Sequence, residues 1–334
     1  MSRYRSMKHI TGFTLTVDED LLKASDIALR KCLGVKPGEI VLVIADEPLR
    51  KIGLHIWLKA LDLNTEAVYM EMKPRKIHGE EPPKPVAEAM KVSNVVIAPT
   101  SRSLTHTMAR KEAVERGARV ATMPGITEEI FIRTMNVDYE YVKDLTERVA
   151  SVLDKGKEVR VVTRAGSDLS FSIESRKARR STGILVNPGD WGNLPGGEAY
   201  IAPIEGTANG VLVIDGSMAG IGILREPIKV VFENGIAVKI EGGKEARILS
   251  EMLSKHGEEA RYLGEFGIGT NPGARISGVV LEDEKALGTI HIAFGSNFDF
   301  GGHIKAGIHL DGVVKDPDVY VDGELIMRSG KLLI

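Results

Sequence analysis

Residues 39–123 alternate short apolar runs with segments whose apolar residues recur at helical spacing. The first run, 39–46, is rich in Val and Ile, and residues 49–61 follow it with the period of a helix. Alternating strands and helices imply right-handed crossovers and a mainly parallel sheet covered on both faces. The same order recurs in strands predicted at 66–72, 94–99 and 118–123 and in helices predicted at 85–91 and 105–116.

The pattern changes near residue 154. An amphipathic helix predicted at 139–153 runs into a polar turn, and short strands separated by glycine turns follow, with hairpins at 228–240 and 319–326 and one helix at 244–255. Most of the 36 glycines lie in this half, which predicts bulges and tight loops. We therefore predict an α/β fold in which an N-terminal open, mainly parallel α/β sheet domain (1–154) precedes a C-terminal β-rich α+β metal-binding domain (155–334).

Length and charge narrow the function. At 334 residues the chain exceeds the size at which one hydrophobic core usually stops growing, which agrees with two domains. Its 44 Lys and Arg against 46 Asp and Glu leave a net charge of -2, so charge attracts neither nucleic acid nor an anionic membrane. We expect a peptide or small-molecule substrate instead.

Two local features exclude other classes of site. The turn after the first predicted strand, Asp46-Glu47-Pro48, lacks the glycines that hold a pyrophosphate, which disfavours a dinucleotide cofactor. Cys32 is the only cysteine and lies in a helix predicted at 21–33, which excludes an internal disulfide and a thiolate metal cluster and indicates a position in the core.

The N-terminal residues 1–10 carry Arg3, Arg5 and Lys8 but are not followed by an apolar stretch of secretory or transmembrane length. We therefore expect a cytoplasmic protein. The sequence contains no Gln and is rich in Glu, Lys and Arg, which is typical of a thermophile.

A histidine and an aspartate lie two residues apart in His309-Leu310-Asp311. In an extended segment such positions point to the same side, so both side chains can face one ion. His291 lies in TIHIAFG (289–295), where alternation predicts a strand. Each feature taken alone also fits a structural role, as a His–Asp pair on a surface strand or as a half-buried histidine bonded to a neighbour.

Two glutamates lie between small and apolar residues: Glu265 in GEFGIGTNP (264–272) and Glu198 in NLPGGEAY (193–200). Burial of a carboxylate is costly unless it is paired or bound to metal, although a helix-cap or turn role is the alternative for each. Three carboxylates and two imidazoles are the inventory of a site with two divalent ions. We therefore predict that the metal ligands are Glu198, Glu265, His291, His309 and Asp311, and that Glu198 and Glu265 are also catalytic.

Such a site carries out hydrolysis without a covalent intermediate, because water held between two ions becomes a nucleophile near neutral pH and the ions polarise the carbonyl that it attacks. The covalent alternatives are weak, since Ser101, Ser103 and Ser181 lie in no nucleophile-elbow pattern. Imidazole and carboxylate ligands suit zinc, cobalt, manganese or iron(II).

The blocks that hold these residues resemble the aminopeptidase T and aminopeptidase S family of thermophilic-type metallopeptidases. The resemblance is clearest over 193–330, in NLPGGEAY, GEFGIGTNP, DEKALGTIHIAFG and GGHIKAGIHLDGV. It implies the same five ligands for two divalent ions (zinc, cobalt, manganese or magnesium), an N-terminal α/β domain, a homodimer, and removal of N-terminal residues from peptides.

Two positions depart from that family pattern. Family members carry a tyrosine where this chain has Phe298 and adjacent glutamates where it has Gly197-Glu198, so a hydroxyl for an oxyanion and an acid that could act as general base are missing. The scaffold is also similar to that of iron(II)-dependent dioxygenases that open dihydroxypyridine rings at a mononuclear site, which is the alternative function. The third possible function is that of a metal-binding relative without peptidase activity.

Overall fold

The computed structural model describes residues 5–10 and 13–334, which divide into two compact units. Met1–Tyr139 and Gly183–Gly196 form the first unit, and Glu140–Thr182 and Gly197–Ile334 form the second. This division differs from the predicted boundary between 154 and 155, because the helix that precedes that turn belongs to the second unit and a later segment returns to the first. The returning segment adds a strand to a distant sheet edge, a pairing that local sequence patterns do not reveal.

The first unit is built on a five-stranded sheet of order β10-β6-β5-β3-β4. Every pair in it is parallel, which confirms the sheet predicted from strand–helix alternation. The strands are β3 (Ile40–Asp46), β4 (Glu66–Met72), β5 (Val95–Ala98), β6 (Arg119–Thr122) and the returning β10 (Trp191–Asn193).

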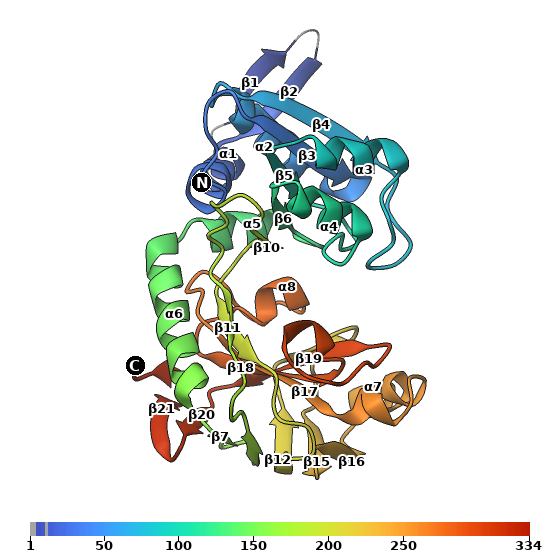
Figure 1. The fold of residues 1–334 in the computed structure, drawn as a ribbon, viewed down its shortest axis with the longest axis vertical. Helices are drawn as coiled ribbons and strands as arrows, with labels where there is room; N and C mark the ends of the chain where they lie inside the picture. The colour runs from blue at the N-terminus through green and yellow to red at the C-terminus, as the bar shows by residue number, and fades with distance from the viewer. Residues whose placement is uncertain (1–4, 11–12) are drawn as a thin grey trace. The chain divides into compact units, whose positions relative to one another are not determined.

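Helices cover both faces of this sheet (Figure 1). Leu42 and Ile44 of β3 share a buried apolar cluster with Met90 of α3. On the opposite face α2 lies so close that a Cβ on Gly53 would stand 2.7 Å from the Cβ of Ala45. The helices are α1 (Glu19–Asp26), continued by a π-helix (Ile27–Cys32), α2 (Arg50–Leu61), preceded by a 3₁₀ turn (Glu47–Leu49), α3 (Lys84–Lys91), α4 (Met108–Glu115) and α5 (Glu128–Met135).

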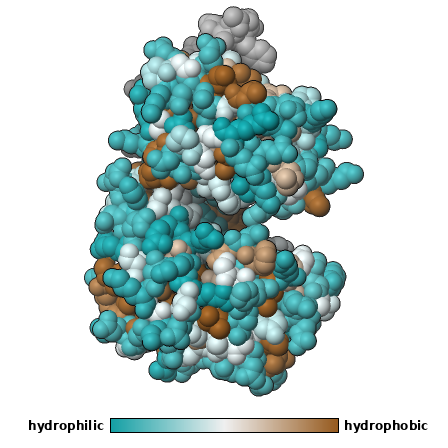
Figure 2. Space-filling view, in the orientation of Figure 1, coloured by the Kyte–Doolittle hydropathy of each residue, from teal (hydrophilic) through white to brown (hydrophobic). Residues whose placement is uncertain are grey.

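The structure bears on the sequence predictions for Cys32, for the N-terminal residues and for membrane-spanning segments. Cys32 is fully buried, as predicted. Of the N-terminal residues, 1–4, with Arg3 among them, lie outside the described part of the chain, while β1 (Arg5–Ile10) and β2 (Phe13–Asp18) pair as an antiparallel hairpin that was not predicted. Across the described residues, every helix is too short or too polar to cross a membrane. Hydrophilic residues predominate on the visible face of each unit (Figure 2).

The second unit contains α6 (Tyr139–Lys155) from Glu140 onward and two antiparallel sheets. The eight-stranded sheet has the order β16-β15-β12-β8-β7-β20-β21-β22, and both predicted hairpins belong to it. Its strands are β7 (Glu158–Val162), β8 (Asp168–Ser172), β12 (Asn209–Ile214), β15 (Ile228–Glu233), β16 (Ile236–Glu241), β20 (Asp318–Val321), β21 (Glu324–Arg328) and β22 (Lys331–Leu332).

The seven-stranded sheet has the order β14-β13-β19-β18-β17-β11-β9. Its strands are β9 (Arg179–Ser181), β11 (Glu198–Ile201), β13 (Ser217–Met218), β14 (Gly222–Ile223), β17 (Leu263–Gly269), β18 (Thr289–Gly295) and β19 (His309–Lys315). The other helices of this unit are α7 (Lys244–Ser254), α8 (Val280–Asp283) and two 3₁₀ turns (Glu258–Arg261 and Phe298–Phe300).

The two sheets of the second unit share one apolar core. Phe266 of β17 packs against Phe171 of β8 with ring centroids 5.4 Å apart, and Phe294 of β18 stacks on Phe232 of β15 at 5.8 Å. Side chains alternate between the two faces of a strand, so the neighbours of these core residues point to the other face of the seven-stranded sheet. That other face carries the polar residues of the predicted site.

His55 of α2 is fully buried in the first unit. Its Nε2 accepts a 2.9 Å hydrogen bond from the backbone N–H of Asp18, and its Nδ1 lies 2.7 Å from the carbonyl oxygen of Lys51. These contacts need a neutral ring with its proton on Nδ1. Burial lowers the pKa of His55 from its usual 6.5.

This lowered pKa predicts a pH-dependent stability. Because the folded-state pKa lies below the unfolded one, the contribution of His55 is present above the unfolded pKa of 6.5 and is lost as the pH falls below it. The free energy of unfolding, measured in urea, should fall more between about pH 7.5 and about pH 5.5 in the wild type than in His55→Gln. The glutamine amide accepts the same bond but does not titrate in this range, so equal pH slopes would contradict the assignment.

Candidate metal centre

Four neighbouring strands present the predicted site residues on one face. In β17, Phe266 and Ile268 enter the core, so Glu265 points to the other face. The cross-strand register pairs Glu265 with Ala293 and Ala293 with Asp311, so the two carboxylates flank a small residue. His291 pairs with Gly267, and His309 with Gly295.

In the structure, contacts between neighbouring side chains link all five predicted residues. Nε2 of His291 lies 3.6 Å from Oε2 of Glu198 and 3.2 Å from Oε1 of Glu265. The other oxygen of Glu265, Oε2, lies 3.5 Å from Nε2 of His309, which in turn lies 3.4 Å from Oδ1 of Asp311. Residues separated by more than a hundred positions in sequence therefore meet at one place.

Four of the five residues are almost entirely removed from solvent. His291 is fully buried, Glu198 and Glu265 are each 6% exposed and Asp311 is 7% exposed, while the side chain of His309 is 34% exposed. Burial raises the pKa of Glu198 and of Glu265, since desolvation disfavours a charged carboxylate. The access that His309 retains marks the side from which solvent reaches the cluster.

The pKa values of both imidazoles and of Asp311 are shifted by the charges of their neighbours. Burial disfavours the protonated form of both rings, but the adjacent carboxylates outweigh it and raise the pKa of His291 to about 9 and that of His309 to about 10. Burial alone would raise the pKa of Asp311, yet His309 lowers it. The cluster is thus a buried set of acids whose charge requires cations beside it.

Three of the five residues meet the geometry that one metal ion needs. Glu265, His309 and Asp311 each offer a ligand atom, and these atoms lie within 4.8 Å of one another. Oδ1 of Asp311 is buried and, apart from the His309 imidazole at 3.4 Å, has no polar partner among the described residues, as suits a carboxylate oxygen that binds a cation. The residues present therefore fit a divalent ion at this position, while Glu198 and His291 lie beside it.

Lys285 also belongs to the cluster, although no local sequence pattern predicts it there. It is fully buried, its Nζ lies 3.1 Å from Oε1 of Glu198, and the same Nζ contacts Glu284. The sequence Asp283-Glu284-Lys285 is typical of a solvated turn before a strand, and it therefore gives no sign that the lysine is buried. The carboxylate of Asp283 accepts hydrogen bonds from the backbone N–H groups of Ser277 and Gly278.

The phenylalanine at 298, which departs from the peptidase pattern, does not supply a hydroxyl to the cluster. Phe298 is 50% exposed and lies under the Lys305 ammonium, so the missing hydroxyl is not replaced there. Tyr200 instead follows Glu198 by two residues on β11 and shares its face. Its ring lies 5.5 Å from that of Phe300, which lies 6.0 Å from the His309 ring, so a phenol does border the cluster.

Gly197 leaves no room for a second acid. Its φ of +122° is one that side-chain-bearing residues rarely adopt, and a Cβ there would stand 2.6 Å from the Cβ of Asn271. Adjacent glutamates therefore cannot occur at 197 and 198 with this backbone.

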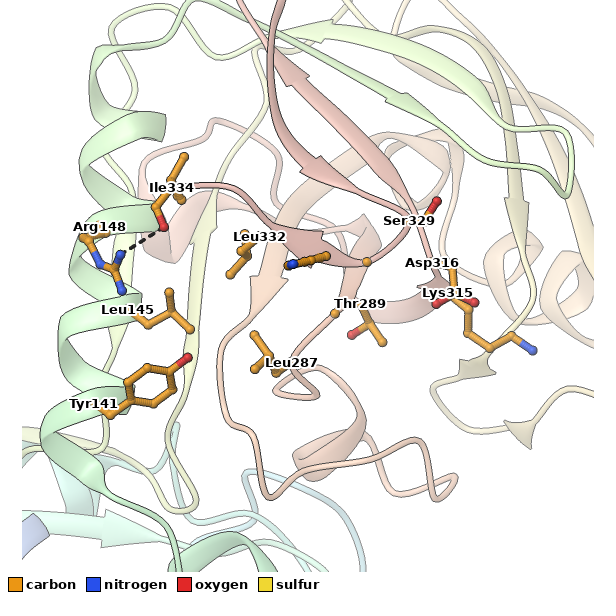
Figure 3. Close-up of a pocket in the computed structure, with 13 residues that line it drawn as sticks. Tyr141, Leu145, Arg148, Leu287, Thr289, Lys315, Asp316, Ser329, Leu332 and Ile334 are labelled. Atoms are coloured by element: carbon orange, nitrogen blue, oxygen red, sulfur yellow. Dashed lines mark hydrogen bonds between the residues drawn. The ribbon is translucent and has the colours of Figure 1, made fainter.

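A pocket of about 650 Å³ in the second unit lies elsewhere. Figure 3 shows Tyr141, Leu145 and Arg148 of α6 on one side of it, with Arg148 donating a hydrogen bond to the carbonyl oxygen of Ile334. Thr289, two residues before His291, also lines it, but none of the five predicted site residues does. The residues that could hold a metal ion therefore lie outside this pocket.

Gly267 makes the space that the ring of His291 occupies. A Cβ at this position would stand 2.0 Å from Nε2 of His291, so Gly267→Ala must displace the imidazole from Glu265. We expect Gly267→Ala to weaken divalent-metal binding about 10–100-fold, the usual effect of losing a residue that orients a ligand. Isothermal titration of chelator-treated protein with zinc measures this.

The matched control is Gly192→Ala, whose Cβ would meet Leu185 at an ordinary 3.4 Å in the first unit. It should leave metal affinity unchanged. Equal affinities of Gly267→Ala and the wild type would show that His291 has no influence on the ion.

Comparison with known proteins finds two kinds of enzyme. A 2,5-dihydroxypyridine 5,6-dioxygenase of Pseudomonas putida is 25% identical over 263 residues, which cover 73% of this chain and 72% of that protein. Aminopeptidase T of Thermus aquaticus is 26% identical over 311 residues, which cover 78% of this chain and 74% of that protein. The predicted resemblance to aminopeptidase T is thus supported, but a dioxygenase matches as well.

Solved structures show the same fold. The 2,5-dihydroxypyridine dioxygenase of Pseudomonas putida superimposes with a TM-score of 0.78 at 20% identity, covering 94% of this chain and 96% of that one. Wild-type aminopeptidase T of Thermus thermophilus gives a TM-score of 0.70 at 20% identity, covering 95% and 99%. The predicted α/β fold class is confirmed. A family model described as "NicX: 2,5-dihydroxypyridine 5,6-dioxygenase" matches residues 20–334, and the chain therefore belongs to that family.

Proposed function

We propose that this protein is a metal-dependent hydrolase of aminopeptidase type. The observation that carries the proposal is the group Glu265, His309 and Asp311, whose ligand atoms lie within 4.8 Å of one another on a buried sheet face. The relatives of both kinds are enzymes and support an enzymatic use of this group.

The ligand set favours hydrolysis over oxygen chemistry. Iron(II) oxygenases typically use two histidines and one carboxylate, whereas this group offers one histidine and two carboxylates. The second imidazole, on His291, lies outside this group and contacts Oε1 of Glu265 at 3.2 Å. An oxygen-rich set suits zinc, cobalt, manganese or magnesium. When bound, such an ion supplies a water nucleophile at neutral pH and polarises a carbonyl group.

We assign roles to Glu198 and Tyr200 from their positions beside the ligand group. Glu198 lies outside the three-residue group and has Oε2 turned toward His291, so we assign it to accept the proton of the attacking water. Tyr200 shares the face of Glu198, and its hydroxyl is the donor assigned to the oxyanion in place of the family tyrosine that Phe298 replaces.

A second candidate is an iron(II)-dependent dioxygenase that acts on dihydroxylated aromatic rings. Two observations favour it. The family model that spans residues 20–334 carries that description. The ring of Phe300 also lies 6.0 Å from that of His309, and the ring of Tyr200 lies beside Phe300, so both offer surfaces on which an aromatic substrate could stack.

Parallel assays separate the two candidates. Chelator-treated protein reloaded with cobalt or zinc should hydrolyse aminoacyl anilides, because the cluster supplies ligands and a proton acceptor. Reloading with iron(II) should give no oxygen uptake with dihydroxypyridines. Oxygen uptake without anilide hydrolysis would reject the hydrolase and support the dioxygenase.

The ligand assignment has its own test. Glu265→Ala and His309→Ala should each abolish metal retention, measured by elemental analysis after purification without chelator, together with activity. His303→Ala, which removes an exposed imidazole outside the group, is the control and should retain the metal. Unchanged metal content in both cluster variants would reject the assignment.

Glu198→Gln tests the proton acceptor. The amide keeps the shape of the side chain but cannot take a proton, so we expect kcat to fall about 10²–10⁴-fold with metal content unchanged. Steady-state kinetics beside elemental analysis measure both quantities. A variant with full kcat would remove Glu198 from proton transfer.

A further inference from the structure

Lys285 is a lysine side chain with no access to solvent, an uncommon setting for an ammonium group. Its Nζ lies 3.1 Å from Oε1 of Glu198 and contacts a carboxylate oxygen of Glu284. The backbone around it is held in place, since the N–H of Lys285 donates to Glu282 and its carbonyl accepts from Asn271. The Lys285 ammonium is therefore held in a fixed position within the cluster.

The charges of the cluster divide into two halves. Glu265, His309 and Asp311 form the half that fits a divalent ion, which would balance the two carboxylates there. Glu198 and Glu284 form the other half, and Lys285 stands between them with the positive charge that they require. Each half would thus have its own cation, a divalent ion in the first and the Lys285 ammonium in the second.

Both oxygens of Glu198 already have cationic or polar partners. Oε1 faces the ammonium of Lys285, and Oε2 faces the imidazole of His291 at 3.6 Å. The ions of a two-metal site lie about 3.5–4 Å apart, so a second ion ligated by Glu198 would lie beside this buried ammonium. Repulsion between such charges is strong where water is excluded, and a fully buried lysine has no solvent into which it can withdraw.

We propose that the Lys285 ammonium takes the place of the second metal ion, so that the site binds one divalent ion per chain. This replaces the two ions expected from the sequence and rests on the proposed function in assuming a metal at Glu265, His309 and Asp311. Glu198 is then an ionised neighbour of the ion, held by Lys285, and not a ligand.

Metal stoichiometry tests this directly. Chelator-treated wild-type protein titrated with zinc or cobalt, followed by calorimetry and elemental analysis, should bind one ion per chain. Lys285→Met removes the charge at similar volume and leaves Glu198 and Glu284 without a cation, so binding should rise to two ions per chain. Lys331→Met, which removes an exposed lysine of β22, is the control and should stay at one.

A second variant keeps the test decisive if Lys285→Met does not fold. Glu198→Gln should still bind one ion, with affinity within about threefold of the wild type, because the amide removes a partner of Lys285 and not a ligand. Two ions in the wild type, one ion in folded Lys285→Met, or loss of the ion in Glu198→Gln would each overturn the inference. No ion in the wild type would instead reject the proposed function, and this inference with it.

Discussion

The seven-stranded sheet of the second unit buries charge on one face and apolar side chains on the other. Strand alternation requires this separation, because Phe266 can enter the core only if Glu265 points away from it. The polar face is nevertheless buried, so its carboxylates are stable only beside cations. The need to balance buried acids shapes the imidazole contacts, the buried lysine and the metal-binding geometry.

Glycine sets how closely these charged groups approach one another. Gly267 lies opposite His291 and leaves the ring space to reach Glu265, while Gly197 brings the start of β11 against Asn271. A bulge between Leu263 and Glu265 changes the register of β17 against β18 just at the glutamate. Bulges of this kind re-aim side chains near functional sites. The glycine content of this half therefore serves the cluster as well as the turns.

The two kinds of relative describe one scaffold with two chemistries, which is common because function depends on the site and not on the fold. This chain combines features of both descriptions. Its ligand group is rich in carboxylates, which suits hard cations, and its buried Lys285 lies 3.1 Å from Glu198, where we propose that it takes the place of a second ion.

The sequence by itself determined the parallel sheet of the first unit, both hairpins of the second and the five residues that meet in the cluster. These follow from local periodicity and from side-chain chemistry, which are properties of short segments. Only the tertiary structure decided that β10 returns to the first sheet, that Tyr200 and not residue 298 borders the cluster, and that Lys285 is buried against Glu198. Each depends on a pairing of distant segments, and a charged residue in a turn carries no local signal of the partner that will remove it from water.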